Sequence, residues 1–319
     1  MRVLATIGFS FSAGVFLAAL LPWNGWQLYA AGGVLLLALA WLFAARKQKY
    51  FRRGLLLLLP LAVSLAYFAG YNHLVRQPIE DRCGAASDFT ATVCDWPQAT
   101  ERGARVAVEL EGYHRARAVL YGEAELLAAR PGDTVTGTAQ WQSAAHFDSD
   151  DVTHFNARGV YALLYGREDV RLSAGDGDAL RWLPQRAGKA FREKVAAIWD
   201  DPRVSGFLTA ELTGDKSAMD DGDYLAMQET GLAHLFAVSG LHCAFLVTLL
   251  ALLISRRQRL LCAVTIPLLL FYMVMVGMSP SVVRACIMQI FLLIAPLFRR
   301  GSDPLTSLAA ALLVILLCN

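Results

Sequence analysis

Polar side chains interrupt one of the most apolar stretches of the chain, between Thr230 and His242. Polar groups inside a membrane-spanning helix are costly, so they usually face a cavity or a partner helix. At 100° per residue, His234, Ser239 and His242 fall within an arc of about 140° on one helix face. This face could line an aqueous path. The alternative is that its imidazole and hydroxyl groups only join neighbouring helices beside Gly240.

The i, i+3 spacing of Ser239 and His242 also permits a serine nucleophile with a histidine base, as in an intramembrane hydrolase. Such a site needs an orienting group and an oxyanion site, and the sequence identifies neither. The run Thr213–Ser217 looks like a phosphate loop only superficially, because the spacing that a phosphate loop requires is missing. We therefore exclude nucleotide binding there and assign no catalytic residue.

A second group of polar residues lies between Gly277 and Ala285, where a Gly/Pro break separates two apolar runs. Ser281 and Arg284 are its candidates for a polar path. Arg284 could extend to the outer membrane interface. Alternatively, it could be a cation that faces a pore passing phosphates.

These residues must be positioned by membrane helices, because 56% of the 319 residues are hydrophobic and only 18% are charged. Soluble chains carry about 25% charged residues. A span needs about 20 apolar residues. The sequence predicts spans over 3–21, 27–45, 54–71, 231–254, 260–277, 281–298 and 304–318, the last of which ends within an apolar run and gives the chain the look of a truncated one.

Basic clusters predict the orientation, because short cytoplasmic loops are enriched in lysine and arginine. Such clusters lie at 46–53, at 256–259 and at 299–300. Alternation of the spans then places the amino terminus in the cytoplasm and residues 73–230 outside it. We expect a multi-pass protein of the cell inner membrane, with an uncleaved first span.

Between the two groups of spans, the pattern changes to short β-rich runs. Five strands are predicted, at 89–94, 104–110, 116–121, 134–139 and 160–165, with a turn at Arg130–Asp133 before the fourth. The fold class is therefore a polytopic α-helical membrane protein with an inserted extracytoplasmic all-β domain. A five-stranded barrel of the OB type suits the number and length of the strands, and such barrels often bind oligonucleotides.

Candidates for DNA binding in this outer domain supply cations and aromatic rings. The region 73–180 is nevertheless acidic, with seventeen acidic residues against ten arginines and no lysine, so it is no bulk clamp for a polyanion. The alternative is that the arginines are merely solvated and the aromatic rings belong to the core. The candidates are Arg105, Tyr113, Arg115, Arg117 and Trp141.

Two further features of the polar region concern its cysteines and its end. Cys83 and Cys94 both lie in the outer region, where they could form a disulfide. Residues 185–199 carry apolar side chains at helical spacing and basic ones on other faces. This amphipathic pattern predicts a helix that lies at the membrane interface or, alternatively, binds a partner.

Three motifs, in this order, resemble the competence region of the ComEC family of competence proteins. They are the runs Leu212–Ser217, Thr230–His242 and Ser279–Ala285, and Arg130–Asp133 and Phe155–Val160 resemble the family's external OB-like domain. The sequence thus divides into four regions: three anchoring helices (1–72), the outer domain (73–180), an interfacial segment (181–230) and a last group of spans (231–319), which by the resemblance is the beginning of the competence transmembrane region.

The resemblance further implies an inner-membrane channel component that takes up single-stranded transforming DNA during natural competence. Its expected partners are DNA, membrane lipid and other competence proteins, and the chain could form a homo-oligomer. Relatives often carry a metallo-β-lactamase-like nuclease domain, whereas this sequence has no His-x-His-x-Asp cluster. We therefore expect neither enzymatic activity nor a metal or other cofactor from this chain. The other candidate functions are a transporter or exporter of another substrate, a scaffold for competence proteins and the hydrolase considered above.

Overall fold

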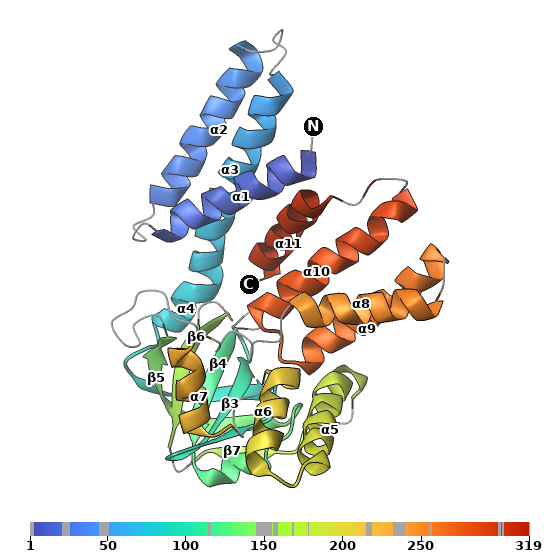
Figure 1. Ribbon diagram of the computed structural model, residues 1–319. Helices are drawn as coiled ribbons and strands as arrows, with labels where there is room; N and C mark the ends of the chain where they lie inside the picture. The colour runs from blue at the N-terminus through green and yellow to red at the C-terminus, as the bar shows by residue number, and fades with distance from the viewer. Residues whose placement is uncertain are drawn as a thin grey trace. The chain divides into compact units, whose positions relative to one another are not determined.

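The chain folds into two compact units in the computed structural model (Figure 1). One unit comprises Met1–Gln77, Arg257–Cys262 and Ile287–Asn319, and the other comprises Pro78–Arg256 and Ala263–Cys286. The structure describes residues 3–20, 26–44, 51–113, 116–144, 155, 159–167, 169–177, 179–214, 219–231, 240–254, 257–298, 301 and 303–318.

Three apolar helices begin the chain: α1 (Val3–Leu20), α2 (Trp26–Ala44) and α3 (Phe51–Tyr71). They lie where spans were predicted at 3–21, 27–45 and 54–71. Helix α1 packs closely on α11 (Pro304–Cys318) at Gly8, where a Cβ would lie 2.6 Å from the carbonyl oxygen of Ala309. Small residues let helices approach closely when lipid gives no hydrophobic drive between them.

Helix α3 does not end at the predicted boundary. It continues through a π-helical turn, η1 (Asn72–Arg76), and then α4 (Gln77–Glu80). The expected boundary between 72 and 73 therefore lies inside helix, and the first strand begins only at Ala86. The sequence changes to polar residues before the helix ends, which is why the two boundaries differ.

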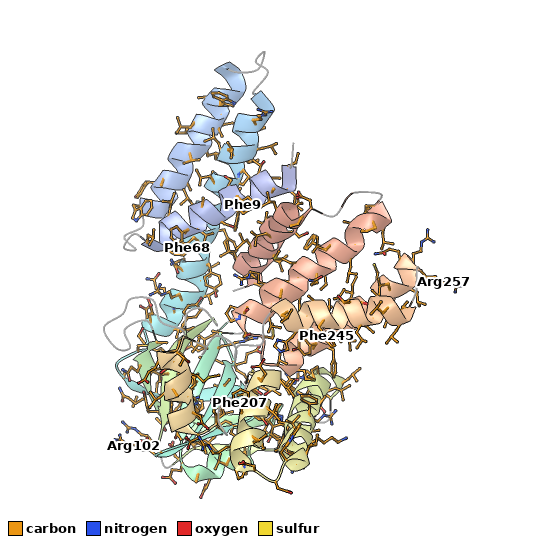
Figure 2. The ribbon with its side chains drawn as sticks, viewed as in Figure 1. Phe9, Phe68, Arg102, Phe207, Phe245 and Arg257 are labelled. Atoms are coloured by element: carbon orange, nitrogen blue, oxygen red, sulfur yellow. The ribbon has the colours of Figure 1, made fainter. Side chains whose placement is uncertain are left out.

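The later apolar helices are α8 (Gly240–Ile254), α9 (Gln258–Met275) and α10 (Pro280–Ile294), and α10 is extended by η7 (Ala295–Phe298). Among the described residues, four helical segments are long and apolar enough to cross a membrane: Val3–Leu20, Arg53–Glu80, Gln258–Met275 and Pro280–Phe298. Three shorter apolar helices are Tyr29–Trp41, Gly240–Ile254 and Pro304–Cys318. Exposed rings such as Phe9 and Phe245 (Figure 2) are 40% and 68% accessible, as expected for side chains that face lipid.

The polar region forms a closed five-stranded barrel from β1 (Ala86–Val93), β3 (Gly103–Leu110), β4 (Arg117–Gly122), β5 (Thr134–Ser143) and β6 (Val160–Gly166). The strand order is β1-β3-β4-β6-β5, and β5 returns to pair with β1. The pair β4–β6 is parallel and the others are antiparallel. The five predicted strands are therefore confirmed. Two three-residue strands were not predicted, β2 (Gln98–Thr100) and β7 (Arg171–Ser173).

The interior of the barrel is filled by alternate side chains of its strands, and the largest of them is Trp141 at 1% exposure. Directly before β5, the predicted turn at Arg130–Asp133 is held by the buried Asp133 carboxylate. This carboxylate accepts hydrogen bonds from the backbone N–H groups of Arg130 (2.8 Å) and Gly175 (3.1 Å). Gly132 has φ +100° in this turn, a conformation that favours glycine. The acidic residue in this motif is thus structural.

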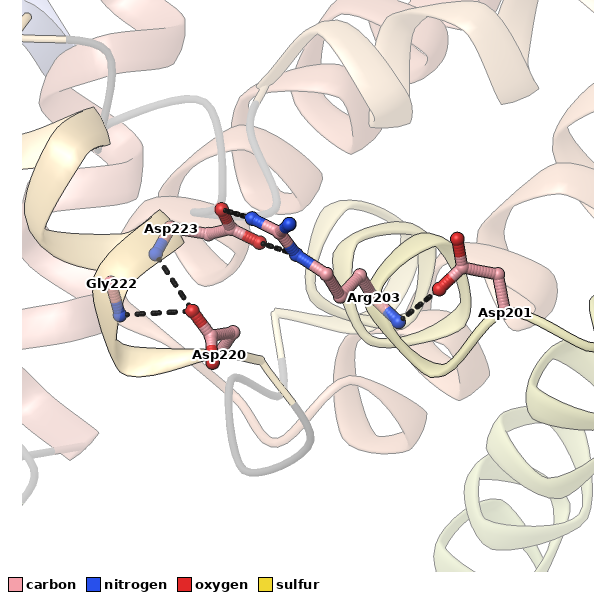
Figure 3. A network of polar contacts seen from close by, with 5 residues as sticks. All are labelled: Asp201, Arg203, Asp220, Gly222 and Asp223. Atoms are coloured by element: carbon pink, nitrogen blue, oxygen red, sulfur yellow. Dashed lines mark hydrogen bonds and ion pairs between the residues drawn. The ribbon is translucent and has the colours of Figure 1, made fainter.

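Three helices follow the barrel: α5 (Leu183–Ile198), α6 (Pro202–Thr213) and α7 (Asp221–Glu229). The amphipathic helix predicted at 185–199 is confirmed as a helix, and its place at a membrane interface stays a prediction. Helix α6 is capped by the Asp201 carboxylate, which accepts from the Arg203 N–H, and the Arg203 guanidinium binds both oxygens of Asp223 on α7 (Figure 3). The hydrogen bonds from the Arg203 guanidinium are the main reason why the pKa of Asp223 lies below its usual range.

Candidate nucleic-acid interface and transmembrane polar residues

The outer face of β3, β4 and β6 carries a row of three side chains that the strand register places side by side. Arg105 lies opposite Tyr121, and Tyr121 lies opposite Tyr165. The two tyrosine rings are stacked, with centroids 5.2 Å apart and planes 14° apart. A cation beside stacked rings is an arrangement on which unpaired bases can stack. We call this row, Arg105–Tyr121–Tyr165, the stacking row.

The two arginine candidates that the structure describes both lie on this face. The Arg105 guanidinium donates to Gln98 Oε1 on β2 at 3.1 and 2.9 Å, so its position is fixed by the short strand that the sequence did not predict. Arg117 is exposed and lies opposite Glu109. The third candidate, Arg115, lies outside the described residues.

Access to the stacking row is greatest at its two ends. Tyr121 packs against a buried cluster formed by Ala144, Phe155, Val160 and Leu163. Tyr165 is 36% exposed. Burial, and to a lesser extent the Tyr121 phenol, raises the pKa of Tyr165, so its hydroxyl remains a neutral hydrogen-bond donor at physiological pH.

The aromatic candidates Tyr113 and Trp141 lie apart from this row. Tyr113 lies in the turn that joins β3 to β4, and its ring centroid is 6.0 Å from that of Trp141 on β5. Trp141 is a core residue whose Nε1–H donates to the Ser87 carbonyl oxygen at 3.3 Å, in line with the alternative that the aromatic rings belong to the core. Its alternation with Val135 and Ala139 along β5 directs it inward.

The disulfide considered for Cys83 and Cys94 is not formed, because both are free thiols. Their Sγ atoms approach different carbonyl oxygens, those of Ile79 and Thr92. Burial is the main cause that raises the pKa of each thiol to about 11. Both thiols are therefore protonated at neutral pH.

Of the polar candidates in the second helical group, His242 on α8 is the one with a described charged partner. Its Nε2 lies 3.9 Å from Oε1 of Glu211 on α6, and both side chains are partly exposed. His234 and Ser239 lie outside the described residues, so their predicted common face with His242 remains untested.

Helices α8 and α10 are in contact near the other two candidates, Ser281 and Arg284, which lie on α10. A Cβ on Gly240 would lie 3.5 Å from the Cβ of Ala285, and the buried Sγ atoms of Cys243 and Cys286 lie 3.4 Å apart. His242 and Arg284 are each one residue away from these contacts. Arg284 is exposed and Ser281 is half-buried. The two polar groups of the sequence therefore come from neighbouring helices.

The break before α10 has a strained backbone. Gly277 has φ +81°. Met278 follows with φ +51°, and among the described residues it is the one non-glycine residue with a positive φ. Such conformations cost about 1–3 kcal/mol for a residue with a side chain. Since Met278 lies between two apolar helices, it fixes the sharp turn that begins the helix of Ser281 and Arg284.

No group of three or more histidine, cysteine or acidic side chains that could hold a metal ion occurs among the residues that the structure describes. The hydrogen-bonding capacity of the candidate sites instead belongs to arginine, tyrosine, histidine and glutamate side chains.

These features define a helical membrane protein with an inserted barrel domain. The model of the family described as Competence protein matches residues 212–319. ComE operon protein 3 of Bacillus subtilis (strain 168) is 32% identical over 121 residues, which cover 37% of this chain and 16% of that protein. No solved structure matches. Over its carboxy-terminal third, the chain is therefore similar to the Competence protein family, and ComE operon protein 3 supports the same resemblance.

Several residues of these sites were missed from sequence. Tyr121 and Tyr165 were recognised as strand residues, but their pairing depends on the parallel register of β4 and β6, which local patterns do not reveal. Glu211 directly precedes the motif that begins at Leu212, yet 31 positions separate it from His242. The position of Glu211 beside a family motif was the one available signal.

Proposed function

We propose that this chain is a membrane component of the channel that takes up DNA during natural competence, and that the transported form is a single strand. The observation that carries the proposal is the stacking row on the open face of an OB-type barrel. Barrels of this kind bind oligonucleotides on the face of their second and third strands, which are β3 and β4 here. The match of residues 212–319 to the Competence protein family supports the same function.

A single strand suits the stacking row better than a duplex does. Stacking rings need unpaired bases, and each stacked base contributes about 1–3 kcal/mol. The acidic balance of the region 73–180 gives little attraction for the dense charge of a duplex. Binding would therefore depend on bases more than on phosphates, with Arg105 and Arg117 as the phosphate contacts.

The second helical group would supply the path through the membrane. His242 and Arg284, on the neighbouring helices α8 and α10, place hydrogen-bond donors and a cation where hydrocarbon would otherwise reject a polyanion. Ser281 adds a hydroxyl group on α10. His234 and Ser239 belong to the same proposed path by their sequence position.

We also propose the cell inner membrane as the location, with a cytoplasmic amino terminus and residues 73–230 outside. The basic clusters at 46–53, 256–259 and 299–300 support this orientation. Lipid, other competence proteins and further copies of this chain are the proposed partners besides DNA. We propose no catalytic role for the chain itself.

Binding of a single-stranded 21-mer of thymidine to the full chain in lipid nanodiscs tests the outer-domain part. Tyr165→Leu should weaken binding roughly tenfold because it removes one stacked base, whereas Tyr165→Phe keeps the ring and should bind normally. Arg105→Ala should lower the salt slope by about 0.7, as expected for one phosphate contact. Arg102→Ala, in the turn before β3 (Figure 2), is the matched control. Equal binding by all four variants would exclude the stacking row.

Uptake of labelled DNA by competent cells tests the membrane path. Arg284→Glu and His242→Leu should reduce uptake at unchanged protein level, because each removes a donor or cation from the path. Unchanged uptake in both variants would remove these residues from the path. Ser239→Ala tests the hydrolase alternative, since loss of the hydroxyl nucleophile should abolish hydrolysis. Loss of export instead of uptake on deletion of the gene would indicate an exporter.

A further inference from the structure

A cavity of about 500 Å³ opens on the barrel at the turn that joins β3 to β4. The residues that line it come from three places: the segment before β1 and β1 itself, the β3–β4 turn, and the end of β5. None of them belongs to the stacking row. The lining residues on which the argument depends are Arg82, Asp88, Phe89, Glu111, Tyr113 and Trp141.

The floor and one wall of this cavity are aromatic. Phe89 and Trp141 are buried at 5% and 1% exposure, and Tyr113 lies beside Trp141. The Arg82 guanidinium carbon lies 5.3 Å from the centroid of the Tyr113 ring and 5.9 Å from that of Trp141. These cation–π contacts hold a planar donor group over the floor.

Three charged side chains line the cavity: Arg82, Asp88 and Glu111. Within the described part of the chain, no residue forms a hydrogen bond or ion pair with the Arg82 guanidinium or the Glu111 carboxylate. Asp88 accepts a long contact of 3.5 Å from the Thr138 hydroxyl through one oxygen. The cavity thus offers one forked donor and two carboxylate acceptors above an aromatic floor.

This set of groups is complementary to one nucleobase in particular. Guanine presents two acceptors, O6 and N7, that take a bidentate contact from arginine. Its N1–H and N2–H₂ are adjacent donors that a carboxylate oxygen pair can accept. Adenine lacks the N1–H, and thymine and cytosine lack the N7 acceptor. Two carboxylates beside one cation also disfavour a phosphate group, so the ligand is a base and not a backbone.

We propose that this cavity binds an unstacked guanine base of the incoming single strand. Arg82 contacts its O6 and N7, Glu111 and Asp88 accept from its Watson–Crick edge, and Tyr113 stacks against its ring. The volume is within the range of small-ligand sites and accommodates one nucleoside. The proposal rests on the function proposed above, and it adds a base preference that the stacking row does not supply.

The test compares four 21-mers that differ only at the central position of a thymidine strand, using the full chain in nanodiscs. The central residue is thymine, guanine, inosine or 7-deazaguanine. We expect guanine to bind roughly tenfold more tightly than thymine, which lies within the range of discrimination by a good bidentate contact. Inosine, which lacks the N2 donor, and 7-deazaguanine, which lacks N7, should each lose most of the gain.

Single substitutions test which side chain contacts which edge of the guanine base. Arg82→Lys keeps the charge but loses the fork, so it should abolish the difference between guanine and 7-deazaguanine. Glu111→Gln should abolish the difference between guanine and inosine. Arg102→Lys, an exposed arginine outside the cavity, is the matched control and should change neither (Figure 2). All three variants should bind the all-thymidine strand as the natural chain does.

The outcomes separate this proposal from the one on which it rests. If the thymidine strand binds and guanine adds nothing, the cavity assignment is wrong and the stacking row stands. If no oligonucleotide binds, both assignments fall. Tight binding of free guanosine monophosphate with no preference within strands would indicate a nucleotide site, which also overturns the proposal.

Discussion

Replacing Glu211 with glutamine removes the carboxylate whose Oε1 lies 3.9 Å from Nε2 of His242. Two unit charges at this distance interact by about 4 kcal/mol at an effective dielectric constant of 20. The side chains keep 25% and 32% of their surface exposed, so water screens much of this energy. The pair therefore stabilises the contact of α6 with α8 by at most about 1 kcal/mol.

A loss of about 1 kcal/mol changes the population of the paired arrangement roughly fivefold. We expect Glu211→Gln to lower uptake of labelled DNA by about this factor, with protein level unchanged. The control is Asp223→Asn, which removes a carboxylate from the neighbouring pair with Arg203 and should leave uptake near normal. The exchange Glu211→His with His242→Glu restores opposite charges and should recover most of the loss. If the exchanged protein is no better than the single variants, the pair does not position His242.

Four other predictions concern the core and the thiols. Trp141→Ala should destabilise the barrel by about 4 kcal/mol, measured as the urea midpoint in pulse proteolysis, because it leaves a large cavity in the core. Cys83 and Cys94, with pKa values near 11, should hold roughly a hundredfold less thiolate at pH 8 than ordinary thiols and react that much more slowly with maleimide. Their raised pKa values favour the folded state below pH 9, and this stabilisation should be lost as the pH rises through 11. Diamide should join Cys243 to Cys286, whose Sγ atoms are 3.4 Å apart, and Cys286→Ser should prevent the bridge seen by mass spectrometry.

Periodicity predicted the elements of this protein well, because both of its regions bury their side chains in regular patterns. The five strands alternate between core and surface, and Val106, Val108 and Leu110 on β3 are a clear case. The apolar helices are almost uniformly hydrophobic. What periodicity could not predict was helix continuing into polar sequence, as α3 does beyond Tyr71.

The sites were predicted less completely, because they depend on contacts between distant parts of the chain. Arg105 and Arg117 were recognised from their alternation, but their aromatic neighbours follow from strand register. Trp141 was chosen as a candidate because it is aromatic. Its position in the alternation along β5 directs it into the core. Arg82 lies between helix and barrel, where no periodic pattern applies, so nothing in the sequence associated it with Tyr113.

The parallel pairing of β4 with β6 has a consequence for how the outer domain is made. Strand β4 ends at Gly122, and its partner begins only at Val160. A chain crossing the membrane from its amino terminus would therefore present β4 with an unpaired edge until β6 has also crossed, and exposed edges invite pairing with other chains. If the domain is exported as proposed, its barrel can close only after β6 has crossed, and truncations or insertions between 122 and 160 should cause aggregation before they affect any binding surface.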